Sequence, residues 1–167
     1  MRGGITFLSS AALSLALASC ETEDPTQLRS GSPLRRRTNN APAVTATGSS
    51  DAEKCFKIVN EYRAQRGVPA LERWSAGERC ADGEAQSDAK SGKAHGAFPS
   101  CEQLAQNECP AYPGSLEEGL PECLADMWAE GPGGGHYENM ASRKYTEVAC
   151  GFHELPNGDF WSVQNFR

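Results

Sequence analysis

The chain has 167 residues, of which 38% are hydrophobic, and carries a formal net charge of −6. This length is sufficient for one domain of ordinary size. The excess of acidic residues argues against a nucleic-acid partner and against a basic patch for membrane surfaces, because both need clustered Lys and Arg.

Residues 1–19, MRGGITFLSSAALSLALAS, have the pattern of a secretory signal peptide. An early arginine precedes an apolar run from Ile5 to Ala18 that is rich in small residues, as in export signals. The run is too short to cross a bilayer as a retained helix. The sequence therefore predicts export and removal of this segment.

The segment Leu17-Ala18-Ser19-Cys20 resembles the lipobox of bacterial lipoproteins. This resemblance implies cleavage before Cys20, lipidation of its thiol and anchoring to the bacterial membrane, with the protein periplasmic or at the cell surface. Several acyl chains hold a protein firmly, since each buried methylene contributes about 0.8 kcal/mol. The alternative is a plain secreted protein in which the early cysteine has no role.

The cysteine count supports lipidation, because seven is an odd number for an exported protein. Lipidation of Cys20 leaves an even set for an oxidising compartment, which predicts up to three disulfides of open pairing: Cys55, Cys80, Cys101, Cys109, Cys123 and Cys150. None of these cysteines stands in a CxxC pair, which argues against a cysteine zinc site.

Residues 20–50 are rich in Pro, Ser, Thr, Asn and Gly and hold no aromatic residue, which predicts a disordered tether behind the lipid. The folded domain is predicted over residues 51–167. It begins with a capping box, SDAE at 50–53, followed by apolar residues at helical spacing as far as Gly67. A second capping box, SAGE at 75–78, predicts a helix that ends near Gly92.

The middle of the chain, with Cys101 and Cys109, is expected to be rich in loops. Pro121 suits the first turn of a third helix that extends to about Glu130, where a glycine-rich loop ends it. Alternating residues from Tyr145 to Phe152, a PNGD turn and the segment DFWSVQNF predict an antiparallel hairpin at the end. Helices followed by strands indicate the α+β class.

Short segments occur in a fixed order along this domain: IVNEYR at 58–63 with GVPAL at 67–71, KAHG at 93–96, AQN at 105–107, MWAE at 127–130, GHYENM at 135–140, VACG at 148–151 and WSVQNF at 161–166. Together they resemble the CAP superfamily, also called SCP-like, which includes cysteine-rich secretory proteins, antigen 5 and pathogenesis-related proteins. The resemblance implies an α-β-α sandwich with a central antiparallel sheet, braced by disulfides.

The same resemblance implies a cleft on which two histidines and two acidic positions converge. The residues carried over are His95, Gln106, Glu130 and His136. Two imidazoles and a carboxylate suit zinc or another divalent metal, so His95, His136 and Glu130 are the candidate ligands, and Glu130 is the candidate base on a bound water.

This sequence departs from the family pattern at three places. Gln106 stands at the first acidic position and cannot ionise; Glu108 is the candidate substitute but is expected to face the other way if the segment is extended. Glu130 follows Trp128 by two residues rather than three, and a carboxylate at a helix C-terminus needs a partner, a histidine or a metal. The family's terminal cysteine-containing segment does not follow Phe166.

Three functions fit these observations. The first is a non-enzymatic extracytoplasmic binding module whose cleft takes a divalent metal, a lipid or sterol, or an envelope component. The second is a zinc-assisted hydrolase of peptide or glycan, which would use Glu130 as its catalytic residue. The third is a structural envelope or adhesion protein with a vestigial cleft.

Overall fold

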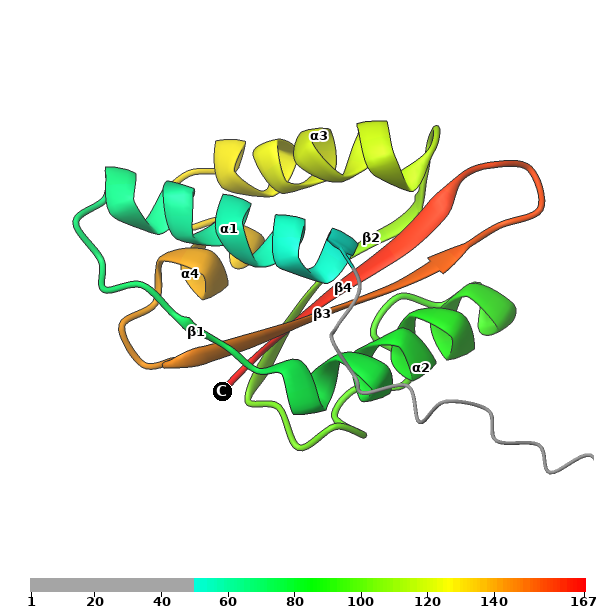
Figure 1. Cartoon of the computed structure of the whole chain (residues 1–167), viewed down its shortest axis with the longest axis horizontal. Helices are drawn as coiled ribbons and strands as arrows, with labels where there is room; N and C mark the ends of the chain where they lie inside the picture. The colour runs from blue at the N-terminus through cyan, green and yellow to red at the C-terminus, as the bar shows by residue number, and fades with distance from the viewer. Residues whose placement is uncertain (1–49) are drawn as a thin grey trace, which may run out of the picture. The chain divides into compact units, whose positions relative to one another are not determined.

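The computed structural model describes residues 50–167. The predicted signal peptide (1–19), the lipidation site Cys20 and all but the last residue of the predicted tether (20–50) lie outside the described residues. The described part contains four helices and four strands (Figure 1): α1 (Ser50–Gln65), β1 (Glu72–Arg73), α2 (Ser75–Ser91), β2 (Ala105–Tyr112), α3 (Leu116–Ala129), α4 (Gly135–Ala141), β3 (Glu147–Glu154) and β4 (Phe160–Phe166).

The four strands form one sheet in the order β1-β3-β4-β2. The last two strands form the expected hairpin, with Val148 opposite Phe166 and Glu154 opposite Phe160. The predicted turn closes it through Gly158, whose φ is +92°. Strand β2 pairs antiparallel with β4 and is an edge strand, while the two-residue β1 runs parallel to β3.

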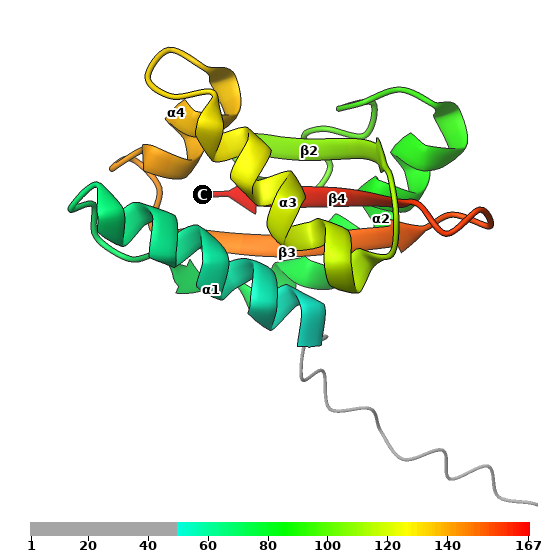
Figure 2. The ribbon, with the colours of Figure 1, turned by 90° about the horizontal axis from the view of Figure 1, so that it is seen from above.

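Helices cover both faces of the sheet, as Figure 2 shows from above. Helix α2 packs through Ala81 and Ala85 against Trp161 and Val163 of β4. Helices α1, α3 and α4 contribute to the larger core on the other face, to which β4 presents Phe160 and Phe166. This confirms the α+β class and the α-β-α sandwich.

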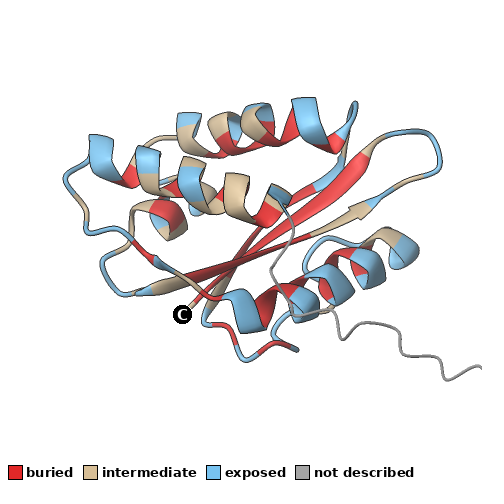
Figure 3. Cartoon of the chain, in the orientation of Figure 1, coloured by how far each residue is buried: buried red, intermediate tan, exposed pale blue. Residues whose placement is uncertain are grey.

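The core lies in two layers, and the helix surfaces that face the sheet are buried while their outer surfaces are exposed (Figure 3). In β4 every residue is buried, because helices cover it on both sides and strands flank it on both edges. No helix among residues 50–167 is long and apolar enough to cross a membrane.

All six cysteines of the domain form disulfides, as predicted, and the structure supplies the pairing. Cys55–Cys150 joins α1 to β3, and Cys109–Cys123 joins β2 to α3. Cys80–Cys101 joins α2 to the loop before β2. Each helix longer than two turns is thus covalently tied to the sheet or to the loop that leads into it.

The first two helices begin where predicted, but the capping boxes predicted at 50–53 and 75–78 do not form. Glu53 forms ion pairs with Lys57 and Arg73 instead of reaching back to Ser50. Glu78 binds the Arg73 guanidinium at 2.6 Å, and helix α2 has Trp74 at its N-cap without a side-chain bond. Arg73 draws both carboxylates towards β1 because an Arg–carboxylate pair is stronger than a bond to a neutral amide.

The start of α3 was predicted wrongly at Pro121. The helix begins at Leu116, with the Ser115 hydroxyl at its N-cap accepting from the Glu118 amide, and Pro121 lies inside it. Proline has no N–H for the carbonyl of Glu117 four residues earlier. Lys54 of α1 supplies the missing donor, because its Nζ donates to the Glu117 carbonyl oxygen.

The middle of the chain was also predicted wrongly as loop where it contains β2. Its residues Gln106, Asn107 and Glu108 are buried although they are polar. Pro110 was compatible with a strand because β2 lies at the sheet edge, and the register shifts between Cys109 and Tyr112. Burial of such a polar segment depends on partners from distant parts of the chain, which local patterning does not show.

Candidate functional site

His95 lies in the loop after α2, held in a left-handed backbone conformation with a φ of +56°. Its backbone N–H donates to Glu108 Oε2 at 2.6 Å, and its ring Nδ1 lies 2.7 Å from Gln106 Oε1. A non-glycine residue in this conformation costs about 1–2 kcal/mol. The bonds to β2 offset this cost and fix the imidazole at the sheet edge.

The hydrogen bonds around Gln106 define which tautomer the neutral His95 ring adopts. Gln106 Nε2 donates to Glu84 Oε2 at 3.0 Å and to Asn165 Oδ1 at 3.1 Å. The amide oxygen therefore faces His95, so Nδ1 carries the proton of the neutral ring. Nε2 of His95 is then left as an acceptor for a ligand.

Glu84 anchors this arrangement from α2. Its Oε1 accepts from Ser100 Oγ and Gln103 Nε2, both at 2.8 Å, and its Oε2 also accepts from Asn165 Nδ2 at 2.6 Å. The carboxylate is buried and accepts bonds from loop, β2 and β4. Sequence reasoning missed it, although Ala81, Glu84, Ala85 and Asp88 lie at the spacing of one helix face and mark polar groups on the packed side.

Asp88 and Glu108 form a second acidic pair under His95. Asp88 Oδ1 accepts from the Ala97 amide at 2.8 Å, while Asp88 Oδ2 and Glu108 Oε1 are buried without a donor among residues 50–167. Burial, and to a lesser extent the neighbouring Asp88, raise the pKa of Glu108 to about 7 against the opposing effect of the His95 amide. The two carboxyl groups can bond to each other only when they share a proton.

This pair predicts that stability falls as pH rises from about 4.5 to about 7. Between these values the folded chain holds a proton that the unfolded chain has lost, since the folded pKa is raised from 4.5 to about 7. The loss should be on the order of 3 kcal/mol and level off above this window. Urea unfolding at several pH values measures it. Glu108→Gln should remove the slope, whereas the exposed Glu61→Gln should keep it; an unchanged slope in Glu108→Gln would refute the assignment.

His136 forms a second pair, with Glu130. The glycine-rich segment does not leave His136 in a loop, because α4 begins at Gly135 and places His136 in its first turn. Nδ1 of His136 lies 2.5 Å from Glu130 Oε1, and the His136 amide donates to Glu130 Oε2 at 3.0 Å. The hydrogen bond from the His136 side chain is the main cause of a lowered Glu130 pKa. The partner expected for Glu130 is thus a histidine.

The His95 side chain and the His136 backbone contact neighbouring residues of strand β2, which point to opposite faces of the sheet. Gln106 points towards α2, where it contacts Glu84, whereas its neighbour Asn107 points to the other face and donates to the His136 carbonyl at 3.0 Å. Asn139 of α4 adds a bond to Asn107 Oδ1 at 2.9 Å. The structure therefore brings His95 to Gln106 and His136 to Glu130.

The same contacts bear on the metal site expected from the sequence. The ring nitrogens left as acceptors would suit a divalent ion, but within residues 50–167 no group of three His, Cys, Asp or Glu side chains is placed to hold one ion. Gln106 has its amide oxygen directed at His95.

The expected orientation of Glu108 was wrong. Positions 106 and 108 are two residues apart in β2 and therefore point to the same face of the sheet. Glu108 Oε2 lies 3.7 Å from His95 Nδ1, on the same side of β2 as Gln106. It faces His95, as a substitute acidic residue should, but its hydrogen bond is to the backbone N–H of His95 and not to the ring.

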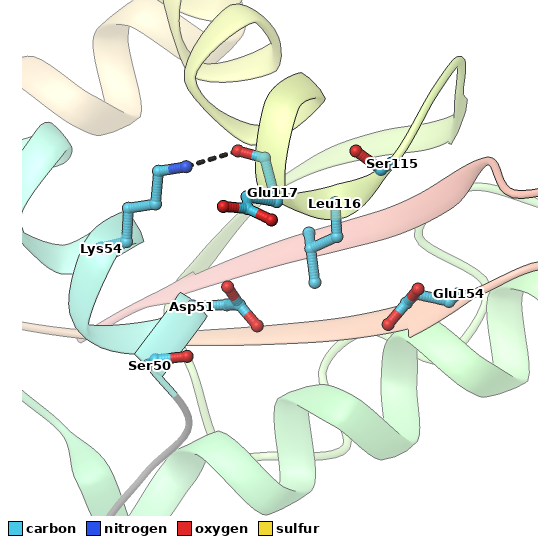
Figure 4. Close-up of a pocket in the computed structure, with 7 residues that line it drawn as sticks. All are labelled: Ser50, Asp51, Lys54, Ser115, Leu116, Glu117 and Glu154. Atoms are coloured by element: carbon cyan, nitrogen blue, oxygen red, sulfur yellow. Dashed lines mark hydrogen bonds between the residues drawn. The ribbon is translucent and has the colours of Figure 1, made fainter.

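Two pockets are candidates for a binding site. The first, about 600 Å³, lies where the starts of α1 and α3 approach the end of β3 (Figure 4), and its lining is mostly acidic or hydroxylic: Ser50, Asp51, Lys54, Ser115, Leu116, Glu117 and Glu154. Figure 4 shows Lys54 engaged with Glu117. This pocket contains none of the predicted site residues.

The second pocket, about 220 Å³, is lined by His95, Phe98 and Gln106. Phe98 is 39% exposed and lies in the segment that the Cys80–Cys101 disulfide ties to α2. The His95 side chain is 44% exposed, whereas Gln106 is buried. An aromatic wall, an imidazole acceptor and a polar floor make this the candidate ligand site.

The sheet between helices and the three disulfides define a disulfide-braced α-β-α sandwich. A family model described as "CAP: Cysteine-rich secretory protein family" matches residues 56–166. The chain therefore belongs to the cysteine-rich secretory protein (CAP) family. A comparison with curated proteins found no match.

Solved structures show the same fold. Venom allergen-like protein 4 of Schistosoma mansoni is 16% identical, with a TM-score of 0.50 over 71% of this chain and 88% of that chain. An outer surface protein of Borrelia burgdorferi is 15% identical, with a TM-score of 0.53 over 70% of this chain and 90% of that chain. A cysteine-rich secretory protein of Staphylococcus aureus is 16% identical, with a TM-score of 0.50 over 70% of this chain but 38% of its own length.

Proposed function

We propose that this chain is a non-enzymatic binding module of the bacterial cell envelope, exported and lipid-anchored through Cys20. Its ligand site is the pocket between His95, Phe98 and Gln106. A surface location is in keeping with the similarity to an outer surface protein of Borrelia burgdorferi. The observation that carries the proposal is the exposed Phe98 beside an imidazole fixed with its acceptor nitrogen unused.

The pocket favours a small amphipathic ligand. An apolar portion would cover Phe98, while a hydroxyl would donate to Nε2 of His95. At about 220 Å³ the pocket takes one end of a larger molecule, such as the hydroxyl end of a lipid or sterol. Gln106, Glu84 and Asn165 hold the imidazole in place before the ligand arrives, which lowers the entropic cost of binding.

The geometry around Glu130 supports binding over hydrolysis. A general base works best with a pKa near the operating pH, whereas His136 lowers the pKa of Glu130 below its ordinary value. Both Glu130 oxygens already accept bonds from His136. This carboxylate is therefore occupied in fixing the start of α4.

We expect 1-hexanol and cyclohexanol to bind the oxidised full-length chain saturably, as measured by NMR shift titration. Phe98→Ala should weaken binding by about 10-fold, since burying one large apolar side chain contributes about 1.5–3 kcal/mol. His95→Ala should weaken it by removing the acceptor. The matched control is Leu104→Ala, which removes an apolar side chain that is 68% exposed and outside the pocket lining. Equal losses in Phe98→Ala and Leu104→Ala would refute the site.

Zinc calorimetry tests the alternative of a metal-assisted hydrolase. Micromolar Zn²⁺ binding that is lost in a His95→Ala/His136→Ala double variant would overturn the metal-free site, and Glu130→Gln would then report on catalysis. Retention on isolated cell wall by the same double variant, together with no binding of either alcohol, would instead favour a structural envelope protein.

A further inference from the structure

Arg63 of α1 is a fully buried cation without an acidic partner. It is 1% exposed, and no carboxylate among residues 50–167 forms an ion pair with it. Its guanidinium donates instead to backbone carbonyls: from Nε to Pro69 at 2.8 Å, and from Nη1 to Met140 at 2.7 Å and Ser142 at 2.8 Å. A buried charge normally has a counter-charge, so its absence here points to an anion supplied from outside.

The guanidinium retains donors for such an anion. Arginine carries five N–H groups, and the three carbonyl bonds use Nε and both protons of Nη1. Nη2 of Arg63 has no hydrogen-bond partner among residues 50–167. It is also not one of the side-chain atoms that are both fully buried and without a partner. Its two N–H groups are available where Arg63 meets the adjoining pocket.

That pocket has a volume of about 270 Å³ and contains a second arginine. It lies between the chain that leads into β1 and the chain that leads from α4 into β3, and its lining residues are Arg63, Pro69, Ala70, Glu72, Arg143, Tyr145 and Thr146. Arg143 uses Nη2 to hold the Gly67 carbonyl at 2.7 Å and forms no ion pair within the described residues. The hydroxyl groups of Tyr145 and Thr146 complete a lining rich in donors.

The two arginines act on each other. Burial lowers the pKa of Arg63, and the positive charge of Arg143 lowers it further, with no opposing contribution from an acid. Glu72 lines the same pocket, but it is exposed to water and forms no ion pair among residues 50–167. An anion held between the guanidinium groups would relieve the repulsion and pair the buried charge.

We infer that the pocket of Arg63 and Arg143 is a binding site for a small oxyanion, a carboxylate or phosphate group. The anion accepts from Nη2 of Arg63 and from the free N–H groups of Arg143, with the Thr146 hydroxyl as a further donor. Because the acidic Glu72 also lines the pocket, the site prefers a compact, weakly charged anion to a large polyanion. This site is separate from the pocket of His95 and Phe98 and does not depend on the function proposed for it.

The test is an NMR shift titration of the oxidised full-length chain in chloride-free buffer, with sodium phosphate in one arm and sodium acetate in the other. We expect saturable shifts centred on residues 143–146. Arg143→Gln should weaken binding by about 10-fold or more, since a charge-assisted bond contributes about 1.5–3 kcal/mol. Glu72→Gln should tighten it by removing repulsion.

The matched control is Arg66→Gln, three residues after Arg63 and just beyond the end of α1, which removes an exposed arginine that does not line the pocket. Binding in this variant should stay within about 2-fold of the parent. Saturation by phosphate alone or acetate alone would support the site and identify the group; saturation by both would support a general oxyanion site. Absence of saturation in both arms, or equal losses in Arg143→Gln and Arg66→Gln, would overturn the inference.

Discussion

Replacing Gly151 with alanine is expected to destabilise the fold by at least about 3 kcal/mol. A Cβ at this position in β3 would lie 2.1 Å from the Ala81 carbonyl carbon and 2.2 Å from the Asp82 nitrogen, both backbone atoms of α2. Because backbone cannot rotate away as a side chain does, α2 would have to move off the sheet. The move would also break the bond from the Phe152 amide to Asp82 Oδ1, now 2.8 Å long.

The matched control is Gly83→Ala in α2, the helix that packs on Gly151. Gly83 of α2 is exposed, has an ordinary helical backbone and has nothing within 4 Å of an added Cβ. Gly83→Ala should therefore stabilise the protein by about 0.5–1 kcal/mol, since alanine loses less backbone entropy in a helix. Thermal and urea unfolding compare the two variants. A Gly151→Ala protein with parental stability would show that the helix and sheet do not pack this closely.

Removal of the Cys55–Cys150 disulfide is the second change with a large expected effect. The bond joins residues 95 apart in sequence and ties α1 to β3, with both cysteines buried. A loop of this length predicts a loss of about 4–5 kcal/mol when the cross-link is removed, because the unfolded chain regains that freedom. We expect the Cys55→Ala/Cys150→Ala variant to unfold at much lower urea, and alanine avoids placing a polar group in the core.

Cys109→Ala/Cys123→Ala is the comparison within the same chain. These residues are only 14 apart, so loop closure predicts a smaller loss of about 3 kcal/mol. Both double variants create small apolar gaps, which makes the difference between them informative about chain entropy. A larger loss from the shorter loop would show that packing around Cys109 and Cys123, rather than loop length, governs the stability.

Several features of the fold could be predicted because they depend on local patterns. The segment from Ser50 has apolar residues at helical spacing, and the segment from Tyr145 to Phe166 alternates around a turn that requires Gly158 at positive φ. Strand β2 escaped prediction because its polar residues are buried by Glu84, Asn165 and His95, which come from elsewhere in the chain. The same long-range bonding explains why Glu53 and Glu78 turn to Arg73 instead of capping their helices.

The candidate site likewise combines residues that local motifs identify with contacts that only the tertiary structure creates. The motif segments named His95, Gln106, Glu130 and His136, and the family resemblance implied that all four converge on one cleft. Strand alternation at β2 directs their contacts, since Gln106 faces α2 and Asn107 faces α4. The acidic residues Glu84 and Asp88 join the site only because α2 packs its inner face on the sheet.

The sequence alone therefore determined the α+β class, the family, the even set of cysteines and the identity of the candidate residues, because these follow from composition, period and ordered motifs. Only the tertiary structure decided the disulfide pairing, the splitting of the histidines into two pairs, and the placing of Phe98 beside His95. It also decided that Arg63 is buried without a counter-charge. Each of these depends on contacts between residues far apart in the chain, and such contacts exist only after helices have packed on both faces of the sheet.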